Sequence, residues 1–274
     1  MNMKIAVLQI DSVLGDIASN LNKVDEMIAG INDKDVRLAV FCEYGLTGYC
    51  TDLTKIANPV PGADSEGLAA IAKKHNIWII GGTAELVGDK IANTALIVSP
   101  KDGFVTKYRK IHPFGDERNS IIYGDEPVVV DTDIGKVGVV ICFDLCFPEL
   151  IRALALKGAE IVVCPTFWFA DSISGPGGWK PESTIALART RALENNIFMA
   201  MACRTGEETA SWSKVRAFGH SCITDSIGNI LALAGLGETV ITAELDPGTR
   251  KKWAEYSHYL ADRRPDIYGK ILDF

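Results

Sequence analysis

The chain has 274 residues, of which 47% are hydrophobic and 23% charged, so it can bury a large core and is not a disordered protein. A formal net charge of −7 argues against a nucleic-acid-binding surface, and no apolar run approaches the length of a membrane span. Seven cysteines, most of them inside apolar runs, and an N-terminus without a signal-peptide pattern favour a cytoplasmic protein with reduced thiols.

The apolar pattern predicts alternating strands and helices along most of the chain. Runs of β-branched residues indicate buried strands, and apolar residues spaced three and four apart indicate amphipathic helices. Such alternation is typical of a mixed α/β sheet with helices on its faces. The predicted strands are 4–10, 36–41, 77–80, 94–98, 103–108, 137–141, 160–164, 197–202, 219–224, 230–234 and 239–245, and the clearest helices are 17–28, 147–157 and 183–194.

Glycine, proline and capping residues predict where several of these elements begin and end. The first helix is expected to stop at Gly30, and Asp64 or Ser65 is expected to cap a further helix that carries Leu68 and Ile71. The glycine- and proline-rich stretch 171–181 is interpreted as one surface loop that could cover an active site.

Cys142 lies where a buried strand is expected to run into a helix. The strand of residues 137–141 ends abruptly at the cysteine, and Pro148 suits the first turn of a helix that stops at Gly158. A thiol at such a turn is lifted out of the sheet, and the positive end of the helix can favour its thiolate form. A buried structural cysteine is the alternative interpretation.

Two other reactive side chains follow predicted strands in the same way. Glu43 comes after the apolar run that ends at Phe41, and Lys110 follows the run that ends at Arg109. The crevice beyond the C-terminal ends of strands is the usual ligand site of α/β sheets. Together with Cys142, these groups would provide a base, an oxyanion donor and a nucleophile. Taken singly, Glu43 could cap a turn and Lys110 could be a surface charge.

Histidine is the usual base for a thiol nucleophile. His112 and His220 each adjoin an apparent strand end, so a Cys–His pair remains an alternative to the carboxylate.

Three separated segments resemble the signature blocks of the nitrilase superfamily, the carbon–nitrogen hydrolases. They are 41–49, 108–112 and 140–144, and both their order and their separations agree with the family. The resemblance extends over nearly the whole chain and implies an αββα sandwich that forms a single domain of residues 1–274. It also implies a homodimer or a higher homo-oligomer, with residues 246–274 as a C-terminal tail at the interface and the helices 147–157 and 183–194 as further interface candidates.

The resemblance implies a role for each reactive side chain. Glu43 would act as general base, Lys110 would stabilise the tetrahedral intermediate and Cys142 would attack, while the backbone N–H of Phe143 would also hold the oxyanion. Glu117 falls where many relatives carry a second glutamate that positions the substrate and the lysine. An ordinary ion pair is the alternative for Glu117, and Asp116 or Glu126 could serve in its place.

Departures from the family pattern bear on the substrate. Many relatives have arginine at the position of Cys146, whose thiol could instead be simply buried, and an uncharged group there would disfavour carbamoyl amino acids. The Cys-Phe-Asp context at 142–144 favours an amide over a nitrile. The run Ile-His-Pro-Phe-Gly at 111–115 supports neither the ω-amidase nor the deaminated-glutathione branch. Phe167 and Trp168 could narrow the pocket for a small or apolar acyl group, or could belong to the core or to a dimer interface.

The sequence therefore predicts an enzyme that hydrolyses a small amide to a carboxylic acid and ammonia through a cysteine thioester, without a cofactor or metal. The alternatives are an N-carbamoyl amine or amino acid hydrolase, a nitrilase, and a non-catalytic protein that only binds a ligand.

Overall fold

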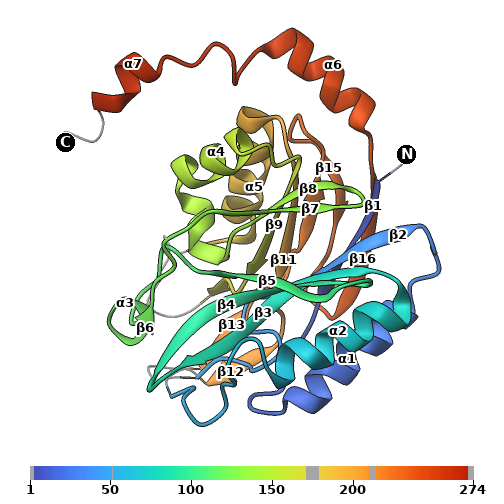
Figure 1. The fold of residues 1–274 in the computed structure, drawn as a ribbon, viewed down its shortest axis with the longest axis vertical. Helices are drawn as coiled ribbons and strands as arrows, with labels where there is room; N and C mark the ends of the chain where they lie inside the picture. The colour runs from blue at the N-terminus through green and yellow to red at the C-terminus, as the bar shows by residue number, and fades with distance from the viewer. Residues whose placement is uncertain (1–2, 51, 171–178, 210–213, 271–274) are drawn as a thin grey trace.

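Two β-sheets face each other, and helices cover their outer faces (Figure 1). This computed structural model describes residues 3–50, 52–170, 179–209 and 214–270. The four layers confirm the predicted αββα sandwich. Within the described ranges, no helix has the length and apolar character that crossing a membrane requires.

The first sheet carries the helices α1 and α2 on its outer face. Its strand order is β16-β1-β2-β3-β4-β5, with β6 paired to one end of β4. The central strands β1, β2 and β3 are parallel, and β5 runs in the same direction because β4 is antiparallel to both of its neighbours. The elements are β1 (Met3–Gln9), α1 (Ile17–Ala29), β2 (Val36–Phe41), α2 (Ala63–His75), β3 (Trp78–Val87), β4 (Lys90–Ser99), β5 (Gly103–Arg109), β6 (Ile121–Ile122) and β16 (Thr239–Leu245).

The second sheet has a similar parallel centre, and the helices α4 and α5 cover it. Its strand order is β15-β14-β11-β9-β8-β7, in which β8, β9 and β11 are parallel. The elements are β7 (Val128–Thr132), β8 (Gly135–Val139), the 3₁₀ turn η1 (Cys142–Cys146), α4 (Pro148–Leu156), β9 (Ile161–Thr166), α5 (Pro181–Asn195), β11 (Phe198–Cys203), β14 (Cys222–Thr224) and β15 (Ile230–Leu233).

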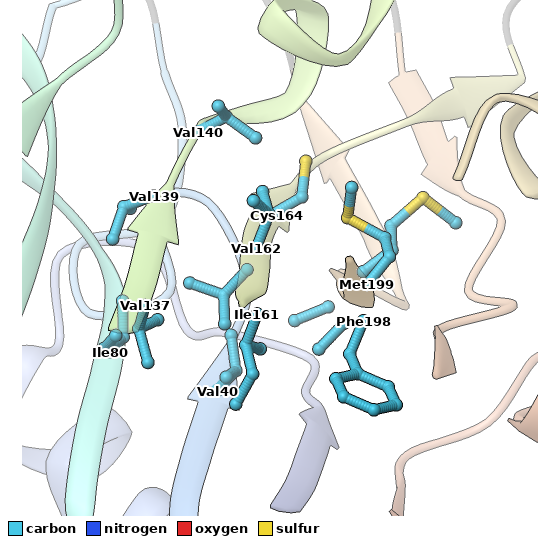
Figure 2. Close-up of a cluster of buried hydrophobic side chains, with 14 of the residues drawn as sticks. Val40, Ile80, Val137, Val139, Val140, Ile161, Val162, Cys164, Phe198 and Met199 are labelled. Carbon is cyan, nitrogen blue, oxygen red and sulfur yellow. The ribbon is translucent and has the colours of Figure 1, made fainter. Parts of the chain in front are cut away.

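Apolar side chains from both sheets fill the space between them. Figure 2 shows Val40 and Ile80 of the first sheet in one cluster with Val137, Ile161 and Phe198 of the second. Most of these side chains are fully excluded from solvent, and strands buried on both faces read as continuous apolar runs. The sheets are therefore held in a fixed relation, which places the ends of their parallel strands next to each other.

Several elements lie outside the sequence prediction. A small third sheet has the order β10-β13-β12, and the short strand β7 borders the second sheet. The C-terminal helices α6 and α7 extend away from the two sheets and bury no residue (Figure 1). These elements are β10 (Phe169–Ala170), β12 (Glu207–Thr209), β13 (Lys214–Ala217), α3 (Glu117–Ser120), α6 (Pro247–Ser257) and α7 (Pro265–Tyr268).

Several predicted boundaries differ from those in the structure, as at β3 and β4, which extend beyond the predicted strands 77–80 and 94–98. The N-cap of α2 is Gly62, because Ser65 instead exchanges hydrogen bonds with the Gly62 backbone from the third helical position, while the Asp64 carboxylate accepts from Thr83. The strand before Cys142 ends at Val139, and one 3₁₀ turn separates the cysteine from α4. The expected surface loop lies mostly outside the described residues, since 171–178 are not among them.

Candidate active site

Glu43 lies in a tight turn directly after β2, packed on the neighbouring strand β3. Gly82 of β3 permits this packing, since a Cβ there would lie 2.5 Å from the backbone nitrogen of Tyr44. The backbone groups of Gly82 bond to the turn on both sides, donating to Cys42 O at 3.1 Å and accepting from Leu46 N at 3.0 Å. The Glu43 side chain is only 2% exposed and points from the C-terminal edge of the first sheet.

Lys110 follows β5 at the same edge of the sheet. Because β5 runs in the direction of β2, its C-terminal end lies on the same side as that of β2. The Lys110 backbone N–H donates to Asn93 O at 2.9 Å, and its carbonyl accepts from Gly124 N at 2.9 Å. With 2% exposure, the lysine is as buried as Glu43.

Cys142 opens the 3₁₀ turn at the C-terminal edge of the second sheet. Its φ of +47° is in the left-handed region, which a non-glycine residue adopts at a cost and which is common at active sites. Arg191 of α5 holds the far end of the turn by donating to Leu145 O at 3.0 Å and to Cys146 O at 3.2 Å. The sharp turn and its support present the thiol to the first sheet.

Glu43, Lys110, Glu117 and Asn93 form a closed hydrogen-bonded group, here called the carboxylate ring. Lys110 Nζ lies 2.8 Å from Glu43 Oε1 and 2.7 Å from Glu117 Oε2. Asn93 Nδ2 bridges the same two carboxylates, at 2.7 Å from Glu43 Oε1 and 2.9 Å from Glu117 Oε1. The remaining Glu43 oxygen accepts from the backbone N–H of Phe167 at 2.8 Å. Two carboxylates therefore share one ammonium group in a buried setting.

The carboxylate ring sets the protonation of its members. Burial raises the pKa of Glu43, although the charge of Lys110 acts against this rise. Burial also acts on Glu117, but the ammonium of Lys110 and the bonds from Lys110, Phe114 and Tyr44 lower the pKa of Glu117 overall. Burial alone would lower the pKa of Lys110, whereas the charges of Glu117 and Glu43 raise it well above its usual value. Glu43 is thus the carboxylate of the ring that is better suited to accept a proton.

The thiol of Cys142 is neutral in this resting arrangement. Burial and the negative charge of Glu43 raise the pKa of Cys142 well above its usual value, and Lys110 offsets only part of the rise. The expectation that a helix end would favour the thiolate is therefore wrong, because α4 begins only at Pro148. A thiol of this kind needs a base at the moment of attack.

Asp144 connects the lysine segment to the cysteine turn. Its buried carboxylate accepts from Tyr108 Oη at 2.6 Å and from Ile141 N at 2.9 Å. It also accepts from the backbone N and from Nδ1 of His112, both at 2.8 Å. Tyr108 and His112 flank Lys110, and Ile141 precedes Cys142, so this one side chain links the segments that carry the amine and the thiol.

The structure brings together most of the site residues expected from the sequence. Glu43, Lys110 and Glu117 bond directly, and charge interactions connect Glu43 and Lys110 to Cys142. Phe143 and Phe167 flank the same region, through the cysteine turn and through the bond of Phe167 to Glu43. Trp168 is buried and packs on Trp179, with ring centroids 4.9 Å apart, so its ring faces the core. It has no described contact with the carboxylate ring.

The two candidate histidines are engaged elsewhere. His112 bonds to Asp144, and His220 Nδ1 contacts the carbonyl of Phe218 at 2.5 Å. The titratable groups that act most strongly on the thiol are Glu43 and Lys110. The described contacts of these two histidines therefore do not support the Cys–His pair considered from the sequence.

Asn93, Tyr44 and Asp144 are components of the site that the sequence analysis missed. Asn93 and the adjacent Thr94 interrupt the apolar run of strand β4 and are fully buried, so buried polar residues inside an apolar run were the available signal. Tyr44 and Asp144 directly follow Glu43 and Phe143 in the motifs, but the sequence does not indicate which distant groups they reach. Among the described residues, no cluster of three or more His, Cys, Asp or Glu side chains could hold a metal ion.

Comparison with known proteins identifies many relatives. The sequence model of the carbon–nitrogen hydrolase family matches residues 4–255. An omega-amidase from Saccharomyces cerevisiae is 32% identical, with 98% of this chain and 96% of the relative covered. A nitrilase from Pyrococcus abyssi is 33% identical, covering 97% and 99%. The crystal structure of a carbon–nitrogen hydrolase from Helicobacter pylori has the same fold, with a TM-score of 0.90, 23% identity and 99% of each chain covered.

Proposed function

The chain belongs to the carbon–nitrogen hydrolase family and is an enzyme that hydrolyses amide C–N bonds, and we propose that Glu43, Lys110 and Cys142 carry out this reaction on small primary amides. The arrangement of the three side chains supports these roles. A buried carboxylate with a raised pKa, a fixed ammonium and a neutral thiol converge on one place.

Acylation begins with transfer of the thiol proton of Cys142 to Glu43. The sulfur attacks the amide carbon, and the carbonyl π electrons move to oxygen, where the Lys110 ammonium and the Phe143 N–H stabilise the oxyanion. The tetrahedral intermediate then collapses. The C–N bond breaks, the nitrogen takes the proton from Glu43, and ammonia leaves a thioester on Cys142.

Deacylation uses the same groups. Glu43 takes a proton from water, the hydroxide adds to the thioester carbon, and collapse of the second intermediate breaks the C–S bond. The proton returns from Glu43 to the sulfur, and the carboxylic acid is released. Glu117 and Asn93 do not exchange protons in this scheme, because they hold Lys110 and Glu43 in place. No step of this scheme requires a metal or a cofactor. That the enzyme needs neither stays a prediction.

The observation that carries the proposal is the position of Lys110 between two carboxylates at the thiol. A surface lysine would not be buried to 2% exposure and bonded at 2.8 and 2.7 Å to two carboxylates. A cysteine with only a structural role would require neither the Lys110 ammonium nor the Glu43 carboxylate beside it. An ammonium fixed in this way is preorganised for an oxyanion, which is the main requirement of acyl transfer.

Ammonia release from a panel of small amides tests the proposal. We expect turnover by the wild type and none by Cys142→Ala, with Cys50→Ala, which removes a half-buried thiol, as the matched control. Electrospray mass spectrometry of the quenched wild type should detect the acyl adduct on Cys142. Undiminished activity in Cys142→Ala would contradict the assignment of the nucleophile, and undiminished activity in Lys110→Ala would contradict the oxyanion role.

A nitrilase is the second candidate, because a nitrilase from Pyrococcus abyssi is among the relatives. The same thiol could add to a nitrile carbon to form a thioimidate. Matched nitriles in the panel separate the two functions, since a nitrilase turns over the nitrile but not its amide. Carbamoyl amines are the third class in the panel, and their hydrolysis would release carbon dioxide together with ammonia.

The proposal extends to the assembly and the cellular location. The single domain of residues 1–274 would form a homodimer or higher oligomer, with the tail 246–274 at the interface. The tail supports this because α6 extends away from the two sheets (Figure 1) and buries no residue. Trp253, Tyr256 and Tyr259 of the tail form an aromatic cluster, in which Tyr256 is 80% exposed. Sedimentation showing only monomers would contradict the interface. The seven free cysteines support a reducing compartment such as the cytoplasm.

A further inference from the structure

We propose that the acyl group of the substrate is uncharged and apolar, and that the site selects against amides that carry a carboxylate. The inference rests on the proposed function and goes further by naming the substrate class. The yeast relative carries the name omega-amidase, which implies an amide at the end of a longer acid. The charge and the aromatic lining of this site argue for a different preference.

The carboxylate ring carries a net negative charge when Glu43 is ready to act as a base. Glu43 and Glu117 contribute two carboxylates, and Lys110 is the one cation bonded to both of them. The Lys110 ammonium is also committed to the oxyanion during catalysis. A second anion on the acyl group would therefore enter a buried, already negative site, where repulsion is only weakly screened.

Arg204, a further buried cation near the site, is already neutralised. Arg204 follows β11 and lies over the ring of Phe167, with the guanidinium carbon 5.1 Å from the ring centroid. Its guanidinium lies 2.6 Å from Glu208 Oε2, and it donates to Glu208 Oε1 at 2.8 Å and to Ser12 O at 3.1 Å. Its side chain is thus committed to Glu208 and to the backbone. A substrate carboxylate could recruit Arg204 only by breaking this buried ion pair.

Aromatic rings form a continuous wall around the reacting groups, here called the aromatic arc. Consecutive ring centroids lie 5.9, 5.3, 6.5 and 5.1 Å apart, within the range of direct ring contact. In order along the wall, the arc consists of Tyr49, Phe167, Phe169, Phe114 and Phe143.

Backbone contacts fix the arc to the catalytic groups. Phe143 directly follows Cys142, the Phe167 N–H donates to Glu43, and the Phe114 N–H donates to Glu117 Oε2 at 3.0 Å. Phe114 remains 38% exposed, and Phe143 and Phe169 are half-buried, so part of the arc is open to an incoming molecule. Such faces favour apolar groups over solvated anions. Lys110 contacts the carboxylate ring and Arg204 contacts Phe167 of the arc, and both cations are already paired with carboxylates.

Three amides that share one CH2CH2 spacer and differ in the terminal group test this selectivity. Butyramide has a terminal methyl group, succinamate replaces that methyl with a carboxylate, and methyl succinamate masks the carboxylate as an ester. We expect kcat/KM for butyramide to exceed that for succinamate at least about tenfold, which corresponds to about 1.4 kcal/mol. Methyl succinamate should regain most of the kcat/KM that succinamate loses, because the site excludes the negative charge and not the longer chain.

Phe114→Arg and Phe114→Leu form a matched pair of variants. Neither change removes the backbone N–H that Phe114 gives to Glu117. We expect Phe114→Arg to raise the succinamate-to-butyramide ratio at least about tenfold over that of Phe114→Leu, because it adds a cation to the arc. Circular dichroism and Tm establish that both variants are folded.

The outcomes separate the inference from the function on which it rests. Succinamate turned over as fast as butyramide by the wild type would overturn the inference and leave the amidase function intact. An unchanged ratio in Phe114→Arg would overturn the placement of the arc at the acyl group. If the wild type releases no ammonia from any of the three amides or from acetamide, the proposed function fails, and the inference fails with it.

Discussion

Asp144 accepts two hydrogen bonds from the same residue, His112, one from its backbone N–H and one from its imidazole Nδ1, each at 2.8 Å. The imidazole is further held by stacking on Phe147, with ring centroids 3.6 Å apart and planes inclined by 8°. His112 lies two residues after Lys110, and Asp144 lies two residues after Cys142. The first sheet contributes the reacting amine and the second sheet contributes the reacting thiol. The bonds between His112 and Asp144 hold the amine segment against the thiol segment.

We expect Asp144→Asn to destabilise the protein and to slow the reaction. An asparagine has one acceptor oxygen in place of two, so at least one buried donor among His112, Tyr108 and Ile141 would lose its partner. An unsatisfied buried donor costs about 1–3 kcal/mol. Urea denaturation should show this loss, and kcat should fall at least about tenfold because the thiol and amine lose their alignment.

Asp35→Asn provides the control for this prediction. Its carboxylate is 83% exposed and lies 3.6 Å from Lys4, so its removal should change stability by no more than about 0.5 kcal/mol. Equal stability and equal kcat in Asp144→Asn and the wild type would show that the link to His112 does not align the site.

Lys110→Met should cost both activity and stability. Loss of an oxyanion donor typically lowers kcat about a hundred- to a thousandfold. The substitution also leaves Glu43 and Glu117 buried without their cation, and breaking a buried ion pair costs about 3–5 kcal/mol. The pKa of each carboxyl must rise in the variant. Its stability should therefore be higher at low pH and be lost as the pH rises through the raised pKa values.

The double variant Lys110→Met/Glu117→Gln separates the two effects. Removing one buried carboxylate should restore much of the stability, but it cannot restore an oxyanion donor. We expect urea denaturation at about pH 8 to show recovery, with ammonia release still about a hundredfold or more below the wild type. Recovery of activity in the double variant would contradict the role of Lys110 in the oxyanion site.

The residues at strand ends could be predicted from the sequence because their signal is local. Glu43 follows an apolar run and Lys110 follows a run of strand-forming residues, and in the structure these runs are the strands β2 and β5, whose ends share one edge. The boundaries of β2 agree to the residue, because charged and turn residues border the apolar run on both sides. The confirmed αββα architecture follows from the same alternation of runs and helices.

The contacts between residues far apart in the sequence could not be predicted in this way. Asn93 lies 50 residues from Glu43, and Asp144 lies 36 residues from Tyr108, so no local pattern links the partners. The resting charge state of Cys142 depends on burial and on Glu43, neither of which follows from the strand-to-helix pattern. The small third sheet was missed because its strands have two to four residues and lack a clear apolar period.

The pH profile of the wild type should have an acid limb above the ordinary range of a carboxyl group. The reactive form has Glu43 ionised, and burial raises the pKa of Glu43 above its usual value of 4.5. Activity should therefore fall as the pH is lowered through this raised pKa. On the alkaline side, the pKa values of Cys142 and Lys110 lie well above 9.0 and 10.5, so no loss is expected up to about pH 9.

Measurement of kcat/KM for one amide between about pH 4 and pH 9 checks this prediction. The free enzyme determines the pKa values in that quantity. A rate that keeps rising as a thiol ionises near pH 8 or 9 would indicate a preformed thiolate nucleophile. That result would contradict the role of Glu43 as the base that activates the thiol.

Asn93→Asp and Asn93→Ala should move the acid limb by different amounts. Asn93 donates to both carboxylates of the ring, and its bond to Glu43 lowers the pKa of that carboxyl. Alanine removes the donor, and aspartate also adds a third negative charge, so the apparent pKa of Glu43 should increase from wild type to Asn93→Ala to Asn93→Asp. Activity at the optimum should fall about tenfold or more, because hydrogen bonds to charged groups contribute about 1.5–3 kcal/mol each.

Asn32→Ala, at an exposed position, is the control and should leave the profile unchanged. A merely structural Asn93 would lower the Tm of both variants and leave the acid limb in place, so the order of the three pH profiles determines whether Asn93 acts through Glu43.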